Sequence, residues 1–175
     1  MSIATVPDST DQSIRPDFEA IFREYSPMIY RTAYAVTGSR HDADDVLQTV
    51  FLKLIRREYP PDLKTNPKAY LHRAAVNMSL DMIRARKRHG HTENIEDLKA
   101  MPSNHMAEEF PGQLSDILSK LDPEAAQILV LRYVHDYSDA EISKMLGTSR
   151  GAIALRLFRL RARLKKLLRS IGDKS

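Results

Sequence analysis

Apolar residues recur at spacings of three and four along most of this chain. Phe18, Ile21, Phe22 and Tyr25 form one such set, and similar sets continue to residue 168. This spacing places side chains on one face of an α-helix, whereas a half-buried strand would show alternation, which no run sustains here. The pattern therefore predicts an all-α protein, in which Ser26-Pro27 kinks or restarts the first helix and Gly38 ends it.

The clearest local pattern runs from Ser138 to Leu168. Ser138 and Glu141 have the spacing of a capping box, which starts a short helix. Gly147 suits the left-handed position that ends it, and Ser149 can cap a second helix. An apolar stripe follows on that second helix: Ile153, Leu157, Leu160, Leu164 and Leu167. Two helices joined by a tight turn with glycine are typical of a DNA-binding helix-turn-helix.

The second helix of this pair is strongly basic. Eight cations occupy most of its remaining positions, and no acid interrupts them: Arg150, Arg156, Arg159, Arg161, Arg163, Lys165, Lys166 and Arg169. A solvated basic face on an ordinary helical hairpin is the alternative interpretation. The single sign of the charge and its place after a capped turn favour nucleic acid.

A second amphipathic helix is predicted from about Lys68 to Arg88, after an Asn66-Pro67 cap. Its apolar side carries Leu71, Ala75, Met78 and Met82. Its opposite side carries Arg73, Asn77, Asp81, Arg84 and Arg88. Arginine suits phosphate contact and asparagine suits a base edge, so this side is a second candidate nucleic-acid surface. A solvated helix is again the alternative.

Between these regions, the segment from His41 to Ile55 predicts a helix whose acidic start complements its dipole. The acids lack the glycine-containing spacing of a calcium loop, so a metal site is the weaker interpretation. On this helix Asp45, Gln48 and Leu52 share one side, which fits a partner surface. Pro60 and Pro61 then open a predicted loop up to Asn66.

Proline and glycine residues mark the boundaries between the segments expected in this chain. We expect a disordered leader over residues 1–16 and a helical domain over 17–90. An acidic linker over 91–112 follows, and then a helix-turn-helix domain over 113–172, in which Asp122-Pro123 caps a central apolar helix. The fold class expected is thus all-α, with two small helical domains joined by a flexible linker.

Composition narrows the function. The 175 residues carry a net charge of +4, and basic blocks flank the acidic segment, which suggests two contacts with a polyanion. Cysteine is absent, which excludes disulfides and thiolate chemistry, and no stretch reaches the length of a membrane span. The sequence contains no glycine-rich phosphate loop and no H-E-x-x-H motif. We expect a cytoplasmic, non-enzymatic protein without cofactor or metal.

Three segments together resemble bacterial RNA polymerase sigma factors of the extracytoplasmic-function (ECF) group. They are Ala43-Asp44-Asp45-Val46-Leu47-Gln48-Thr49-Val50-Phe51, residues 69–88 and residues 121–168. The likeness covers nearly everything from Phe18 to Leu168 except the linker. It implies a factor that directs core RNA polymerase to promoters and helps to open the start site, with an anti-sigma factor as a further partner.

The resemblance also implies roles for individual positions. Asp45, Gln48 and Leu52 would bind core polymerase. The minus-ten promoter element would be contacted by Arg73, Asn77, Asp81, Arg84 and Arg88. The minus-thirty-five element would be contacted by Ser149, Arg150, Arg156, Arg159 and Arg163. The loop from Lys64 to Lys68 would help to capture a flipped base.

Some positions depart from the family pattern. Tyr70 replaces a usual tryptophan, and Leu160 replaces a common alanine. Ala152, Ala154 and Leu155 stand where polar or basic residues are usual, which indicates an unusual promoter sequence. Two rival functions remain open: a stand-alone helix-turn-helix regulator, and a sigma mimic that only binds an anti-sigma factor.

Overall fold

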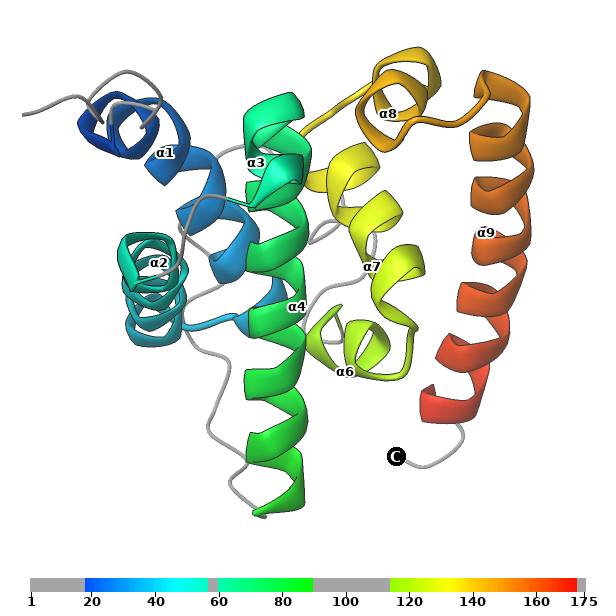
Figure 1. Cartoon of the computed structure of the whole chain (residues 1–175). Coiled ribbons are helices and arrows are strands. Elements are labelled where there is room, and N and C mark those ends of the chain that lie inside the picture. Colours follow the sequence, from blue (N-terminus) through cyan, green and yellow to red (C-terminus); the bar gives the residue numbers. More distant parts are fainter. Residues whose placement is uncertain (1–17, 57–59, 90–113, 173–175) are drawn as a thin grey trace, which may run out of the picture.

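The computed structural model describes residues 18–56, 60–89 and 114–172, and every regular element within these ranges is a helix (Figure 1). The expected leader over residues 1–16 lies outside the described residues, as does the expected linker over 91–112, including His91. In the N-terminal half the helices are α1 (Phe18–Thr37), α2 (Arg40–Arg56), α3 (Pro61–Thr65) and α4 (Pro67–Arg88). In the C-terminal half they are α6 (Leu114–Ser119), α7 (Pro123–Leu129), η2 (Val130–Val134), α8 (Asp139–Leu146) and α9 (Arg150–Gly172).

Two details of the N-terminal half differ from expectation. Helix α1 continues through Pro27, so it does not restart there. Its later turns pack completely, with Ile29 and Ala33 fully buried, and this packing offsets the hydrogen bond that a proline removes. The stretch expected as a loop before Asn66 contains helix α3, which is anchored by the buried side chain of Leu63. Pro61 occupies its first position, where a proline costs no hydrogen bond.

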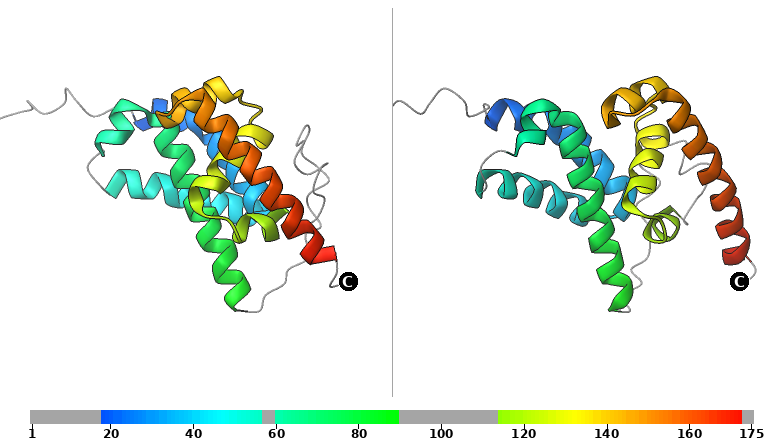
Figure 2. Two further views of the ribbon diagram at one scale, coloured as in Figure 1. Left: turned by 90° about the vertical axis from the view of Figure 1, so that its right-hand side faces the viewer. Right: turned by 45° about the vertical axis from the view of Figure 1, so that its right-hand side comes forward.

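Helix α4 is the centre of the molecule (Figures 1 and 2). Asn66 caps it by accepting a hydrogen bond from the Ala69 amide at 3.1 Å, as the sequence predicted. One side packs on α1 and α2 through Leu71 and Ala75, both fully buried. A second apolar stripe packs in the other direction, against helices whose contact with it was not predicted from the sequence: Val76, Leu80 and Ile83.

That second stripe joins the two halves of the chain in one hydrophobic core. Ala35 and Val36 of α1 and the second stripe of α4 belong to the same cluster as Ile117, Leu118, Leu121, Leu129, Val130 and Val134 of the C-terminal half. Helices α6 and α7 therefore lie directly beside α4, and α2 and α9 lie on opposite sides of the molecule (Figures 1 and 2). In this conformation the halves are packed together rather than independent.

A smaller core supports the helix-turn-helix. Ile142 of α8 and Ile153 and Leu157 of α9 enclose Ile128 and Leu131, and all five are buried. The almost wholly apolar helix predicted after Pro123 is thus central, as expected, and it ends in one π-helical turn. No helix in the described ranges is long and apolar enough to cross a membrane.

Candidate nucleic-acid interface

The helix-turn-helix forms as its sequence predicts. Ser138 and Glu141 complete the capping box, with the Ser138 amide donating to Glu141 Oε2 at 2.8 Å. Hydrogen bonds from Ser138 hold the pKa of the Glu141 carboxyl below its ordinary value. Gly147 ends α8 at a φ of 65°, which glycine adopts without the penalty of a side chain. The Ser149 hydroxyl accepts from the Ala152 amide at 3.1 Å and so starts α9.

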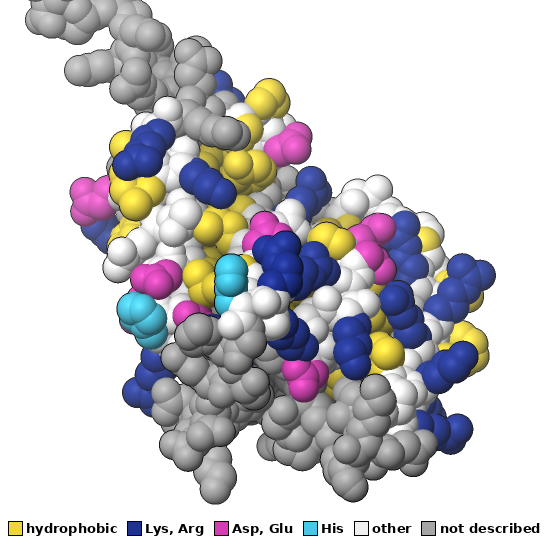
Figure 3. Space-filling model, turned by 90° about the horizontal axis from the view of Figure 1, so that it is seen from below, with side chains coloured by type: hydrophobic (Ala, Val, Ile, Leu, Met, Phe, Trp, Pro, Cys, Tyr) yellow, Lys and Arg dark blue, Asp and Glu magenta, His cyan; other side chains and the backbone are white. Residues whose placement is uncertain are grey.

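Helix α9 separates an apolar face from a basic one. Ile153, Leu157, Leu160 and Leu164 are all buried. The eight cations of this helix are exposed, and no acid lies on it. Seen from below, Lys and Arg side chains gather on the side of the molecule where α9 lies, with hydrophobic side chains between them (Figure 3). The helix therefore presents positive charge without internal neutralisation, which suits a polyanion.

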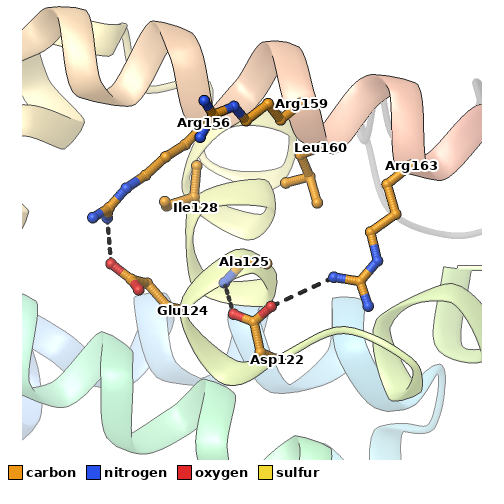
Figure 4. A pocket seen from close by; sticks show the side chains of 8 residues that line it. All are labelled: Asp122, Glu124, Ala125, Ile128, Arg156, Arg159, Leu160 and Arg163. Carbon is orange, nitrogen blue, oxygen red and sulfur yellow. Dashed lines mark hydrogen bonds and ion pairs between the residues drawn. The ribbon is translucent and has the colours of Figure 1, made fainter.

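Two of the arginines predicted to contact the minus-thirty-five element pair with acids at the start of α7 (Figure 4). Arg156 forms an ion pair with Glu124. Arg163 Nη1 lies 3.6 Å from Asp122 Oδ2, and Arg163 also donates to the Lys120 carbonyl at 3.3 Å. These pairs line a hollow of about 220 Å³ between α7 and α9, beside Arg159 and Leu160. Because all four partners are exposed, each pair contributes little stability and can be exchanged for a phosphate.

The predicted minus-ten residues fall into two groups on α4. Arg73, Asp81 and Arg88 are exposed, and Asn77 is half-buried. Arg84, in contrast, donates to the Leu121 carbonyl at 2.6 Å and to the Ser119 carbonyl at 3.3 Å. In this conformation Arg84 therefore holds the C-terminal half against α4, a contact that its helical spacing did not reveal.

Asp45, Gln48 and Leu52 share one side of α2, as predicted. Leu52 is 46% exposed and Gln48 is exposed, while Asp45 lies 3.5 Å from the exposed His41 ring. The structure adds Ile55 of α2, which is 62% exposed, and Phe22 of α1, which is 42% exposed. Exposed large apolar side chains beside a polar pair are typical of a protein-binding surface. The exposure of Phe22 was not evident from the sequence, because its spacing placed it in the apolar set of the first helix.

Sequence reasoning also missed a pair of histidines between the two halves. The ring of His72, from α4, is fully buried and lies 5.4 Å from the ring of His135, which follows η2. His135 Nε2 lies 2.8 Å from the Thr32 hydroxyl, whereas neither ring nitrogen of His72 has a hydrogen-bond partner among the described residues. The burial of His72 could have been predicted from the sequence, because His72 continues the stripe of Val76, Leu80 and Ile83 at helical spacing.

Burial dominates the electrostatics of this pair. It lowers the pKa of His135 to about 4, with further contributions from Arg31 and Lys68. Burial also lowers the pKa of His72 well below its ordinary value, with further contributions from His135 and Lys68. Both rings are therefore neutral near pH 7, and a proton on either would be unfavourable in the packed conformation.

Polar contacts also join the N-terminal and C-terminal halves of the chain. Asn66 Nδ2 donates to the Met145 carbonyl at 3.2 Å, and Lys68 Nζ lies 4.5 Å from the centre of the Tyr137 ring. Lys87 Nζ lies 2.6 Å from Asp116 Oδ1. In the part of the chain that the structure describes, no group of three or more potential metal ligands is placed to bind an ion.

Comparisons with known proteins agree with this geometry. A family model for sigma-70 region 2 matches residues 21–89, and one for sigma-70 region 4 matches residues 112–164. The chain is 30% identical to the ECF RNA polymerase sigma factor SigM of Mycobacterium tuberculosis, over 86% of this chain and 76% of that protein. It is 30% identical to SigE of Mycolicibacterium smegmatis, over 90% of this chain and 64% of that protein.

Among solved structures, the fold is similar to that of the sigma factor RpoE in complex with the anti-sigma factor NepR from Bartonella quintana. The TM-score is 0.53 at 20% identity, and the match covers 87% of this chain and 97% of that one. At this identity the likeness concerns the fold alone.

Proposed function

Because the chain belongs to the ECF group of RNA polymerase sigma factors, we propose that it directs core polymerase to promoters through two separate DNA contacts. The observation that carries this proposal is that the chain has two candidate DNA-binding surfaces. One is a capped helix-turn-helix whose second helix carries cations and no acid, and the other is the exposed polar side of α4. Sigma factors are DNA-binding initiation factors rather than catalysts. We propose accordingly that this chain supplies no catalytic residue and acts in the cytoplasm, where the polymerase is.

Roles for individual residues follow from the surfaces. Asp45, Gln48 and Leu52 bind core polymerase, together with the neighbouring exposed Ile55 and Phe22. Arg73, Asn77, Asp81 and Arg88 lie towards the minus-ten element. Ser149, Arg150 and Arg159 face the minus-thirty-five element directly, while Arg156 and Arg163 join them after leaving their acidic partners.

Contact with both elements requires the two halves to separate. The elements lie about 25 base pairs apart, which is about 85 Å of duplex. Helix α4 spans only about 33 Å, and its second stripe shares a core with the C-terminal half. Separation also releases Arg84 from the Leu121 carbonyl, so that it can take its minus-ten role. The packed conformation is therefore the free form, in which promoter contact is incomplete.

An anti-sigma factor is a further proposed partner. The similar RpoE structure holds such a protein, and the present chain has the same fold. Such a partner would keep the chain from polymerase by covering the surface of Gln48 and Leu52 or by stabilising the packed halves. Co-purification from the native host, followed by binding assays with the Gln48→Ala variant, would distinguish these two modes.

Run-off transcription with core polymerase on genomic fragments tests the main proposal. Specific transcripts are expected only when the chain and core enzyme are both present. A chain that binds duplex DNA tightly and specifically without polymerase would support the stand-alone regulator instead. A chain that binds an anti-sigma factor but starts no transcript would support the mimic.

Two variants separate the proposed surfaces. Gln48→Ala should weaken binding to core polymerase, whereas Lys53→Ala, on another exposed side of α2, is the matched control. Arg156→Ala should lower promoter use while sparing core binding. Equal effects of Gln48→Ala and Lys53→Ala on core binding would contradict the assignment of the α2 surface.

A further inference from the structure

The exposed face of α9 carries an apolar stripe along its midline. In the first three turns of α9, the positions that face away from the buried side on a helical wheel are Gly151, Ala154, Leu155, Phe158 and Ala162, and all of them are exposed; Lys166 and Arg169 continue the same face further along the helix. Phe158 is 69% exposed and Leu155 is 48% exposed, which makes them two of the five large apolar side chains that the described residues leave in solvent. A helix that only needed solubility would carry polar residues here.

Cations flank this stripe on both sides. Arg156, Arg159 and Arg163 lie along one edge, and Arg150, Arg161 and Lys165 lie along the other. A helix in the major groove has this arrangement, because its outermost face meets the base edges and its flanks meet the two phosphate backbones. This placement of cations on both sides of the stripe favours a duplex as the occupant over an apolar protein surface, which would offer no anion to Arg150 or Arg159.

Gly151 adds an independent observation. A Cβ atom at this position would meet no other atom within 4 Å, so packing within the chain does not demand glycine. Glycine is also a poor helix former. Its absent side chain leaves the first turn of α9 free to approach a base edge closely, beside the Ser149 cap.

We propose that Leu155 and Phe158 determine promoter specificity by contacting thymine methyl groups in the minus-thirty-five element. The C5-methyl group of thymine is the apolar group that the major groove presents, whereas the other edges offer hydrogen-bond donors and acceptors. Leucine and phenylalanine against those edges would remove water without replacing its hydrogen bonds. The element read by this chain is therefore rich in A·T pairs opposite Leu155 and Phe158. This inference rests on the proposed sigma function.

The test uses holoenzyme, formed from the full chain and core polymerase, and a promoter library randomised upstream of the minus-ten element. Selection should enrich thymines at fixed positions. Each enriched thymine is then replaced by deoxyuridine, which lacks only the methyl group. We expect promoter binding to weaken by about fourfold for each contacted methyl, the effect of removing one buried methyl-sized group.

Variants connect the methyl groups to the two side chains. Leu155→Asn and Phe158→Asn should each lose discrimination between thymine and deoxyuridine at one position, and Phe158→Leu should retain it. Arg159→Gln is the matched control, since it should weaken binding to both templates equally. Both apolar side chains are exposed, and thermal denaturation checks that each variant is folded.

The outcomes distinguish a failure of the sigma function from a failure of the methyl contact. Failure to select or transcribe any sequence would remove the proposed sigma function itself. Specific transcription with equal binding of thymine and deoxyuridine templates would overturn the methyl contact alone. The methyl contact would also be overturned if Leu155→Asn and Phe158→Asn abolish transcription while the unmodified chain shows no methyl effect, because the stripe would then contact the polymerase.

Discussion

Acidification should loosen the packed conformation through His72 and His135. Both rings lie between the two halves, and burial lowers both pKa values below the ordinary 6.5, that of His135 to about 4. The neutral rings therefore stabilise the packed form, and this stabilisation is complete above about pH 6.5. It is lost as the pH falls towards 4, because the unfolded or separated chain takes up protons first.

The size of the effect follows from His135. A fall in pKa from 6.5 to about 4 corresponds to about 3 kcal/mol between the two limits. At about pH 5, the loss from His135 is about 2 kcal/mol, because the free imidazole is then almost fully protonated and the packed one is not. His72 adds to this loss in the same direction. The charged neighbours Arg31 and Lys68 oppose protonation of the pair, and Tyr137 stacks on the His135 ring.

Equilibrium unfolding in urea at about pH 7.5 and about pH 5 measures this loss. The double variant His72→Met, His135→Gln keeps an apolar group in the buried site and a hydrogen-bonding group opposite Thr32. Between the two pH values it should lose at least about 2 kcal/mol less than the unmodified chain, because His72 adds to the contribution of His135. His41→Gln, at an exposed ring on α2, is the control and should behave like the unmodified chain. Equal losses in the double variant and the unmodified chain would refute the assignment.

Four further outcomes are expected. Because the chain lacks cysteine, dyes can be placed on Lys64→Cys and Lys166→Cys, and their energy transfer should fall when core polymerase is added; unchanged transfer would contradict separation of the halves. Leu121→Ala should lower the free energy of unfolding by about 2–5 kcal/mol in chemical denaturation, since this side chain is 1% exposed in the shared core. Glu124→Gln should release Arg156 and strengthen binding to duplex DNA, with a salt dependence steeper by about one phosphate contact in fluorescence anisotropy titrations. Gly147→Ala should destabilise the helix-turn-helix by about 1–2 kcal/mol in thermal denaturation, since its φ of 65° is left-handed; no loss would contradict this.

Local rules predicted much of this molecule. The caps at Asn66, Asp122 and Ser138 form as expected, and so does the left-handed stop at Gly147, because each depends on residues within a few positions of one another. The buried stripe of α9 also follows from its period. The all-α class needed only these local signals.

Long-range pairing was the part that sequence could not supply. Helix α4 has two apolar stripes, and a wheel shows both but does not say that a second set of helices covers the stripe containing Leu80. The Arg84 side chain looked like a free cation because its acceptor, the Leu121 carbonyl, lies 37 residues away in the chain. Backbone acceptors carry no side-chain signature, so no periodicity could have indicated this bond. Spacing alone decides which residues share a side of a helix, as for Asp45, Gln48 and Leu52 on α2, and this part of the prediction needs no long-range information.

The core shared between α4 and the C-terminal helices also sets how this factor competes for polymerase. If only the separated form binds, its apparent dissociation constant rises in inverse proportion to the fraction that is open. Each 1.4 kcal/mol held in the packed interface then raises the concentration needed for half-saturation about tenfold. Substitutions at buried positions such as Leu80 or Ile117 would change the fraction of the chain in the separated form. They would thereby change how well this factor competes with other polymerase-binding factors for core polymerase, while leaving its promoter preference unchanged.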